Sequence, residues 1–324
     1  MAHEIQDVEF KNLQDVIDNI VDNNVKGGSP FGRAVAWGIY YALRDEKYEN
    51  MEEMRSMLKR VSAELVALKP TMAACKNAAD LIKDYVATFS DDADVKTVAA
   101  KVQRVCMNLV DYSFEAVDDL GAYGANMVKD GDVIMINSYS SSIMSVFGHA
   151  ADQGKKFTVI STESRPFRES IKGANYLASK GVKVIWIGDP AMHEFVGKAN
   201  WCITGADTLG FDGSAANKIG TAQLAELAFA RGIPFYIASE IFKLKRDTRE
   251  GDMIPIEVRP AEDFLFGNEF DGLTPEQRAN ITIINQFFDL TPAQHITGLV
   301  TEFGIIPPAT VGLYWDKLAE MIIR

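Results

Sequence analysis

The segment at residues 162–170 (TESRPFRES) contains side chains suited to holding a phosphate group. Arg165 and Arg168 each offer a planar guanidinium fork whose geometry matches two phosphate oxygens. Glu163, in the same segment, could instead pair with these arginines in an ordinary solvated loop. The segment directly follows an apolar stretch, so both interpretations of Arg165 stay open at this point.

A second segment, residues 204–228, brings a carboxylate and a lysine into one stretch of chain. Asp207 follows an apolar stretch directly, and a carboxylic acid in a closed site can give or take a proton. Asn217 and Lys218 come just before an apolar helical pattern, and the N-terminus of a helix favours anions. The plain structural alternative is that Asp207 caps a turn and that Lys218 is a surface charge.

Two further features are weak evidence for a phosphate site when each is taken by itself. Lys243 follows another apolar stretch, but together with Lys245 and Arg246 it fits a solvated basic face better. Gly27 and Gly28 could cradle a phosphate with backbone N–H groups, although most glycine pairs are simple turns. Both features gain weight only if the fold brings them to the two segments above.

Short buried strands precede these segments. The sequence predicts strands at 132–137, 156–161, 182–187, 201–204 and 234–238, each followed by a helical or helix-like segment. Continuous apolar strands that alternate with helices indicate a doubly wound parallel sheet. Ligands bind such sheets beyond the carboxyl ends of the strands, which is where the chemistry-bearing segments fall.

The first part of the chain has a helical period and no strand pattern. Helices are predicted at about 10–21, from Pro30 onward, and at 51–68, 74–89 and 95–117. The fold class is therefore α/β, with a helical N-terminal domain followed by a Rossmann-like doubly wound sheet domain. We expect the domains to cover residues 1–125 and 126–324.

The bulk composition narrows the possible functions. The 324 residues carry a formal net charge of −12, which disfavours broad binding to nucleic acid, although a few basic groups can still attract a small anion. Three cysteines and four histidines lack metal-ligand spacing, so we expect neither a metal nor a cofactor. No apolar run is long enough to span a membrane, and the first residues do not form a secretory signal. We therefore expect a cytoplasmic protein.

Four segments are together similar to one known family: TESRPFRES, GADTLGFDGSAANKIGTAQLA, GIPFYIASEIFK and FFDLTPAQHITGLVTEFGIIPP. They resemble the family that contains ribose-1,5-bisphosphate isomerase, methylthioribose-1-phosphate isomerase and the regulatory subunits of initiation factor 2B. The resemblance is close in the second part of the chain and looser in the first. It implies a helical domain joined to a Rossmann-like domain, and a homo-oligomer built on a dimer.

The resemblance also implies a chemistry. The enzymes of this family convert an aldose 1-phosphate into a ketose phosphate, and they use a cysteine and an aspartate. Asp207 matches the aspartate, whereas Ser138 stands at the position of the cysteine. Because a serine hydroxyl is a far weaker acid than a thiol, Ser138 cannot supply an anion unaided.

The family resemblance assigns binding of the phosphorylated sugar to residues from both domains. These are Lys26, Gly27, Gly28, Lys69, Arg165, Asn217, Lys218 and Lys243. Two of them, Lys26 and Lys69, stand where the enzymes usually carry arginine. Lysine keeps the positive charge but loses the bidentate fork.

Two functions follow from these matches. The first is an aldose–ketose isomerase acting on a sugar 1-phosphate, favoured because Asp207, Asn217 and Lys218 are all present. The second is a non-catalytic regulatory or sensor subunit that binds a phosphosugar or nucleotide and a protein partner, favoured by Ser138. A dehydrogenase-like nucleotide binder is disfavoured, because no GxGxxG follows the first predicted strand.

Overall fold

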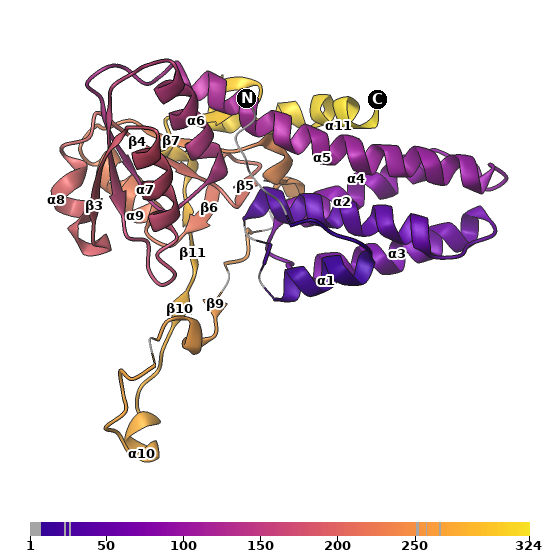
Figure 1. The fold of residues 1–324 in the computed structure, drawn as a ribbon, viewed down its shortest axis with the longest axis horizontal. Helices are drawn as coiled ribbons and strands as arrows, with labels where there is room; N and C mark the ends of the chain where they lie inside the picture. The colour runs from indigo at the N-terminus through magenta and orange to yellow at the C-terminus, as the bar shows by residue number, and fades with distance from the viewer. Residues whose placement is uncertain (1–7, 23, 26, 251–252, 257, 266) are drawn as a thin grey trace.

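The first part of the protein is helical in a computed structural model that describes residues 8–22, 24–25, 27–250, 253–256, 258–265 and 267–324 (Figure 1). At the starts of three helices, an asparagine or aspartate side chain accepts a backbone N–H group, which stabilises the helix end. The described helices of this part are α1 (Leu13–Val21), α2 (Gly28–Asp45), α3 (Met51–Leu68), α4 (Ala73–Ala87) and α5 (Val95–Ala125).

The second part is built on a mostly parallel sheet with the order β13-β12-β7-β4-β1-β2-β3, in which only β12 and β13 pair antiparallel. Its strands are β1 (Val133–Ile136), β2 (Thr158–Thr162), β3 (Lys183–Ile187), β4 (Trp201–Gly205), β7 (Phe235–Ala238), β12 (Gly298–Thr301) and β13 (Gly304–Ile306). The predicted α/β class is therefore confirmed. The strand order reverses between β1 and β4, the place where doubly wound sheets bind ligands.

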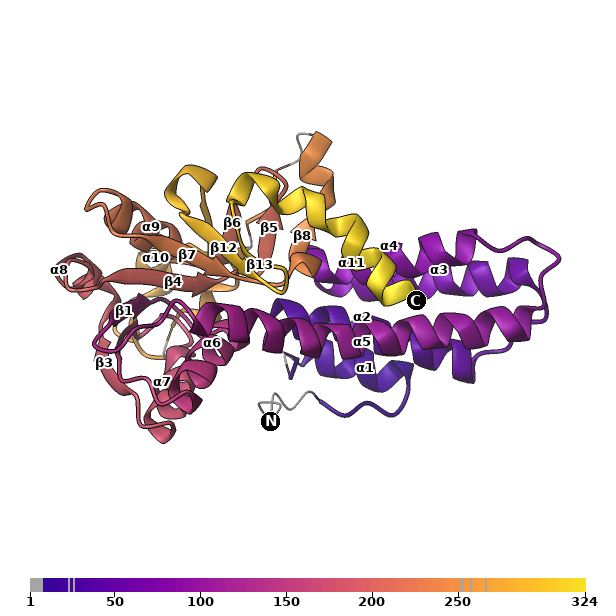
Figure 2. The same cartoon turned by 90° about the horizontal axis from the view of Figure 1, so that it is seen from above.

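Helices cover both faces of this sheet (Figure 2). On one face, α6 (Ser141–Asp152) and α7 (Ser170–Ser179) pack through an apolar cluster that includes Ile143, Phe147 and Leu177. On the other, α8 (Met192–Val196) and α9 (Thr221–Phe229) join the cluster that continues into the helical domain. The central strands are thus shielded from water, as their continuous apolar sequences require, whereas the edge strands β3 and β13 are partly exposed.

A second, smaller sheet was not predicted. It has the order β11-β6-β5-β8, with β5 (Thr208–Gly210), β6 (Ala215–Lys218), β8 (Leu244–Lys245) and β11 (Phe288–Thr291). Asn217 and Lys218 precede a helix, as expected, but they belong to the end of β6 and pair with Asp289 and Phe288. The helix begins only at Thr221. Pairing with a distant strand decides the conformation of this polar stretch, and no local pattern shows it.

Glycines let α5 approach α6 closely. A Cβ atom added to Gly121 would lie 2.0 Å from Oγ and 2.7 Å from Cβ of Ser145, and 2.9 Å from Cδ2 of His149. A Cβ atom on Gly124 would lie 2.5 Å from Cγ2 of Val146. These contacts make the α5–α6 packing depend on residues without side chains.

We expect Gly121→Ala to lower the free energy of unfolding. Overpacking costs about 1–3 kcal/mol, which exceeds the roughly 1 kcal/mol that alanine gains over glycine inside a helix. Urea unfolding measures the change, with Ala122→Ser at the adjacent exposed position as the control. Equal midpoints for Gly121→Ala and the wild type would contradict this packing.

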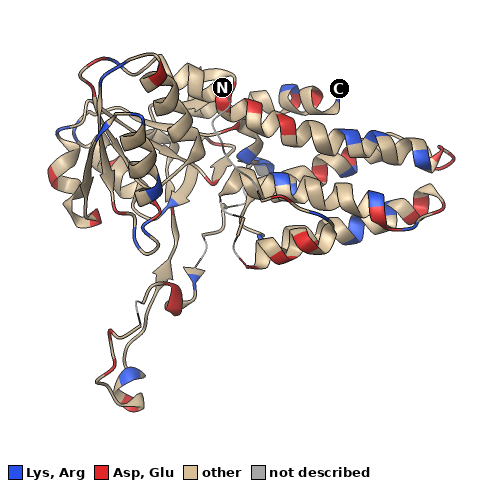
Figure 3. Ribbon diagram, viewed as in Figure 1, with Lys and Arg blue, Asp and Glu red and all other residues tan. Residues whose placement is uncertain are grey.

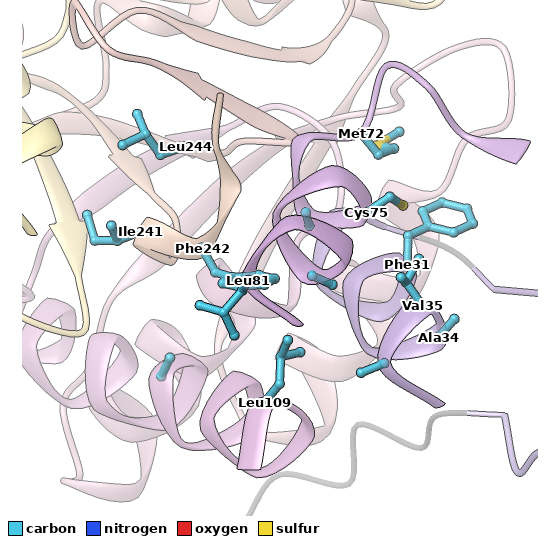
Figure 4. Packing of buried hydrophobic residues seen from close by; sticks show 14 of the residues in the cluster. Phe31, Ala34, Val35, Met72, Cys75, Leu81, Leu109, Ile241, Phe242 and Leu244 are labelled. Atoms are coloured by element: carbon cyan, nitrogen blue, oxygen red, sulfur yellow. The ribbon is translucent and has the colours of Figure 1, made fainter. Parts of the chain in front are cut away.

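The connection after β7 anchors the sheet domain in the helical domain (Figure 4). Ile241 and Phe242 of the short 3-10 helix η2 (Ile241–Lys243) are buried in the same apolar cluster as the helix residues. Asn77 of α4 donates hydrogen bonds to the carbonyl oxygens of Phe242, at 2.7 Å, and Leu244, at 2.8 Å. The backbone on both sides of Lys243 is therefore fixed.

An arm extends away from the body of the protein (Figure 1). It is formed by β9 (Val258–Arg259), β10 (Asn285–Gln286) and the one-turn helix α10 (Pro275–Arg278), which starts with a capping box from Thr274. The two strands pair antiparallel at the base of the arm. Arg259 is therefore held beside β11 and the sheet domain.

The C-terminal helix α11 (Trp315–Ile323) returns to the helical domain and lies beside α5, where Asn108 donates a hydrogen bond to the carbonyl oxygen of Ile322 at 3.0 Å (Figure 2).

Acidic and basic residues are interspersed along the helices of the bundle (Figure 3). In the part of the chain that the structure describes, every helix is too short or too polar to cross a membrane.

Candidate active site

Polar side chains from separate loops gather at the carboxyl ends of the parallel strands. Ser138 follows β1, Asp207 follows β4, and Lys243 follows β7 in the turn η2. Lys218 reaches the same edge from β6, and the N-terminus of α2 enters from the helical domain. We call these four side chains, together with the N-terminus of α2, the strand-end site.

Asp207 is half-buried beside the start of α2. Its backbone N–H donates to the carbonyl oxygen of Ala216 at 2.9 Å, which fixes the residue against β6. A Cβ atom added to Gly28 would lie 3.1 Å from the Asp207 carbonyl oxygen and 3.2 Å from Cε of Lys243. Gly28 therefore lets α2 approach both residues.

The N-terminus of α2 can bind an anion. Gly27 occupies the N-cap position at a φ of 95°, a conformation that favours glycine, and has no side chain of its own to cap this end. The first N–H groups of a helix have no partner within the helix, and the helix dipole adds positive charge there. Lys26, also assigned to phosphate binding, lies outside the described residues.

The corresponding end of α9 is already occupied. Asp289 of β11 accepts hydrogen bonds from the N–H groups of Gly220, at 2.7 Å, and Ala222, at 3.1 Å. Burial raises the pKa of Asp289 to about 6, while these hydrogen bonds act in the opposite direction. The expectation that the helix after Lys218 offers its N-terminus to phosphate is therefore wrong, because a carboxylate of the protein binds there.

Lys243 is buried and not part of a solvated basic face, which corrects the simpler interpretation of its sequence. Its Nζ lies 3.1 Å from Oε2 of Glu240 and donates to the carbonyl oxygen of Ala206 at 3.0 Å. Burial alone pushes the pKa of Glu240 up, but Lys243 and a hydrogen bond from Ser29 outweigh burial and hold this pKa below its usual value. The hydrogen bond from Ser29 to Glu240 links this segment after β7 to α2.

Lys218 is also buried, with its side chain 5% exposed. Its Nζ lies 3.1 Å from Oε1 of Glu169 and 3.1 Å from the ring centre of Phe287. Burial lowers the pKa of Lys218, whereas the charges of Glu169 and Asp207 act in the opposite direction. The Asp207 carboxylate is thus within electrostatic range of Lys218.

Asn217 belongs to a chain of hydrogen bonds behind the site. Its Nδ2 donates to Oγ1 of Thr221 at 2.9 Å, and Nδ2 of Asn137 donates to the same oxygen at 3.2 Å. Thr162 in turn donates to Oδ1 of Asn137 at 2.7 Å. These bonds tie the ends of β1, β2 and β6 together, so in this structure Asn217 supports the site from behind.

Ser138 is held in an unusual conformation. It has a φ of 68° and is 6% exposed. Its N–H donates to Oγ of Ser164 at 2.8 Å, and its hydroxyl donates to Oε1 of Glu169 at 2.7 Å. Positive φ values at residues other than glycine cost about 1–3 kcal/mol and concentrate at functional sites.

Two remaining predicted residues lie around this centre. Arg165 is on the loop that carries Glu169, and its N–H donates to Oδ2 of Asp189 at 2.8 Å. Lys69 follows α3, and its Nζ is 5.3 Å from the ring centre of Phe31, at the start of α2. Their contact with a phosphate stays a prediction.

Arg259 and its aromatic neighbours were missed by sequence reasoning. The guanidinium carbon of Arg259 lies 3.5 Å from the ring centre of Phe287, the ring that Lys218 also contacts. Phe167 packs against Phe287 with 5.3 Å between ring centres. A lone arginine in the arm and two separate phenylalanines gave no signal, because only the pairing of β9 with β10 and of β11 with β6 brings them here.

The cysteines offer no reactive thiol in place of Ser138. All three are buried and unpaired. Burial raises the pKa of Cys75 and of Cys202 to about 12, and raises that of Cys106 as well. Among the described residues, no group of three His, Cys, Asp or Glu side chains is arranged to hold a metal ion.

A second buried carboxylate lies next to the site. Glu302, after β12, accepts hydrogen bonds from the Tyr112 hydroxyl at 2.5 Å and from the Ile241 N–H at 3.1 Å. Burial raises the pKa of Glu302 to about 8, the Tyr112 hydrogen bond lowers it, and the charge of Glu240 adds to the increase. The folded protein therefore favours protonated Glu302.

This gives an expected dependence of stability on pH. Because the folded pKa of Glu302 exceeds the unfolded one, its contribution is fully present below about pH 4.3 and is lost as pH rises toward about 8. Glu302→Gln keeps the acceptor oxygen without the charge, so this variant should be more stable than the wild type at pH 9. The expected difference is a few kcal/mol, because each unit of pKa difference between the folded and unfolded states corresponds to about 1.4 kcal/mol. Urea unfolding at pH 5, 7 and 9 measures this, with the exposed Glu320→Gln as the control. Parallel pH profiles for Glu302→Gln and the wild type would refute it.

The fold and the strand-end site define an α/β protein with lysines and carboxylates gathered at the switch point of a doubly wound sheet. Residues 24–308 match the Initiation factor 2 subunit family, and the chain belongs to that family. The predicted resemblance is thereby confirmed.

Relatives of known name include isomerases. The ribose 1,5-bisphosphate isomerase of Methanocaldococcus jannaschii is 30% identical over 302 residues, which cover 93% of this chain and 93% of that protein. The methylthioribose-1-phosphate isomerase of Thermosipho africanus is 27% identical over 314 residues, covering 93% and 88%. These names support the predicted enzyme class.

The solved structure of an initiation factor is also similar. The Pyrococcus horikoshii OT3 translation initiation factor eIF-2B superposes with a TM-score of 0.76 at 27% identity, covering 91% of this chain and 97% of that one. Isomerases and initiation-factor proteins are therefore both among the relatives, and the choice between them depends on the site.

Proposed function

We propose that the protein is an aldose–ketose isomerase that acts on a sugar 1-phosphate. The observation that carries the proposal is the arrangement at the carboxyl ends of β1, β4 and β7, where Asp207 and Lys243 lie against the N-terminus of α2 and Ser138 and Lys218 meet at Glu169. This arrangement combines an anion-binding helix end with the half-buried carboxylate of Asp207. The names of the curated relatives point to the same class of substrate.

The site residues divide into two roles in this proposal. The N–H groups at Gly27 and Gly28, together with Lys243, hold a phosphate by the helix dipole and by charge. Asp207 shuttles a proton, first giving it to the ring oxygen so that the sugar ring opens. Ser138 faces the carbon chain of the opened sugar as a hydrogen-bonding group or proton relay. Arg165, Lys69 and Lys218 add positive charge around the phosphates.

The experiment is a turnover assay with the full chain. Ribose 1,5-bisphosphate, methylthioribose 1-phosphate and 5-deoxyribose 1-phosphate are each incubated with the protein, and ketose formation is followed by ¹³C NMR. We expect the new ketone signal with at least one of them. Absence of turnover with all three would remove the proposal and favour the regulatory-subunit alternative.

The alternative draws on one specific observation, Ser138 at the position where the family enzymes have cysteine. A subunit of that kind would bind a phosphosugar or a nucleotide without changing it, and would present a surface to a protein partner.

We further propose that the protein is a cytoplasmic homodimer or a larger homo-oligomer. Sedimentation velocity would establish the number of subunits.

A further inference from the structure

One contact in the strand-end site has no role in the chemistry described so far. The Ser138 hydroxyl donates to Oε1 of Glu169 at 2.7 Å, and the same carboxylate oxygen lies 3.1 Å from Nζ of Lys218. Glu169 therefore lies between the residue that replaces the cysteine and a buried lysine. Sequence reasoning did not select it, because it looks like one more charge in TESRPFRES.

Helix capping does not explain the position of the Glu169 side chain. It is the N-cap residue of α7, yet its side chain makes no capping hydrogen bond. Among the described residues, nothing donates a hydrogen bond to its buried Oε2 atom. The ion pair with Lys218 involves only Oε1, and a buried oxygen left without a hydrogen-bond donor is costly, which points to a role beyond stability.

The loop around Glu169 is also strained. Ser164 and Arg168 have φ values of 59° and 54°, and they share this left-handed conformation with Ser138. Ser164 is bonded to the N–H of Ser138, so the three unusual residues belong to one connected unit. Ser138, which has one of these φ values, is also the residue whose hydroxyl donates to Glu169.

We propose that Glu169 and Ser138 form a proton-accepting dyad that replaces the missing thiol. A serine hydroxyl is a poor base or nucleophile alone, and an adjacent base that takes its proton removes this weakness. Glu169 acts through Ser138 and not on the sugar itself, and the ion pair with Lys218 orients its carboxylate. This inference rests on the proposed isomerase function.

In the proposed step, a proton leaves the C2 hydroxyl, a hydride moves from C2 to C1, and the ring oxygen gains a proton. The hydroxyl proton at C2 of the sugar moves to Oγ of Ser138, while the hydroxyl proton of Ser138 moves to Oε1 of Glu169. The electron pair left on the C2 oxygen forms the carbonyl, and the hydrogen on C2 moves with its bonding pair to C1. The bond from C1 to the ring oxygen breaks as Asp207 gives that oxygen a proton. Solvent then returns a proton to Asp207 and removes one from Glu169.

The test compares Glu169→Gln with a matched control in the same loop. Glu163→Gln also removes a carboxylate that is 26% exposed and pairs with a cation, Arg168, but it does not contact Ser138. We expect Glu169→Gln to lower kcat by about 10²–10³-fold with KM changed only a few-fold, and Glu163→Gln to leave kcat nearly unchanged. The decline of kcat at acidic pH should also be altered in Glu169→Gln, because this residue must be ionised to accept the proton.

A rescue separates proton acceptance from a merely structural role. A cysteine can ionise without an adjacent base, so Ser138→Cys combined with Glu169→Gln should be at least about tenfold faster than Glu169→Gln alone. Ser138→Ala combined with Glu169→Gln should be no slower than either single variant, because the two residues act as a unit.

The outcomes distinguish failure of the Glu169–Ser138 dyad from failure of the isomerase function. A Glu169→Gln kcat within about threefold of wild type, or no gain from the added cysteine, overturns the dyad and leaves the isomerase standing. If the wild type turns over none of the three sugar phosphates, the isomerase proposal and the dyad fall together.

Discussion

Asp207→Asn is expected to lower kcat by about 10³-fold while KM changes only a few-fold. Asparagine keeps the size of the side chain and the backbone bond to Ala216, but it cannot carry the proton to the ring oxygen. A loss confined to kcat is the signature of an interaction made only in the transition state. Steady-state kinetics with the best sugar phosphate measures both constants.

The control for this variant is Asp212→Asn. Asp212 lies in the β5–β6 turn of the same segment, where Oδ1 accepts the N–H of Ser214 at 2.9 Å. Asparagine retains that acceptor, so the turn and the activity should both persist. An Asp207→Asn enzyme as fast as Asp212→Asn would show that the proton comes from elsewhere.

Lys243→Met is expected to destabilise the protein by about 3–5 kcal/mol, because it leaves the charge of Glu240 buried without its partner. The pKa of Glu240 lies below its usual value in large part through Lys243, so the substitution removes the group that keeps this carboxylate ionised inside the protein. Urea unfolding at pH 7 measures the free energy.

Two further variants show whether charge or packing is responsible. Lys243→Met combined with Glu240→Gln buries no charge, so most of the lost stability should return. Phosphate binding should stay weak in this double variant, since the cation is still missing. Lys245→Met, whose ion pair with Asp247 is nearer the surface, should cost about 1 kcal/mol or less. If the double variant is as unstable as Lys243→Met, packing and not charge controls this position.

The main sheet was largely predictable, because its strands are continuous apolar runs separated by helices. The five predicted strands all occur as β1, β2, β3, β4 and β7, with ends shifted by one or two residues. The strands β12 and β13 and the small sheet were missed. Their sequences are short and polar or glycine-containing, and pairing with distant segments forms them.

The candidate site was predictable only as a set of loops. The rule that ligands bind beyond the carboxyl ends of parallel strands placed Ser138, Asp207 and Lys243 at one edge of the sheet. It could not give the burial of each charge. Lys243 resembled the neighbouring Lys245 and Arg246 in sequence, and its ion pair with Glu240 depends on how η2 packs against α4. Glu169 and Asp289 were missed for the same reason. No sequence pattern marks a carboxylate that pairs with a buried lysine, as Glu169 does, or that accepts backbone N–H groups, as Asp289 does.

The most direct measurement is a crystal structure of Asp207→Asn soaked with the sugar phosphate that the wild type turns over. We predict one phosphate against the N–H groups of Gly27 and Gly28 and near Lys243, with the C1–C2 bond of the sugar between residue 207 and Ser138. A sugar phosphate bound at another surface, with these two side chains far from C1 and C2, would contradict the account.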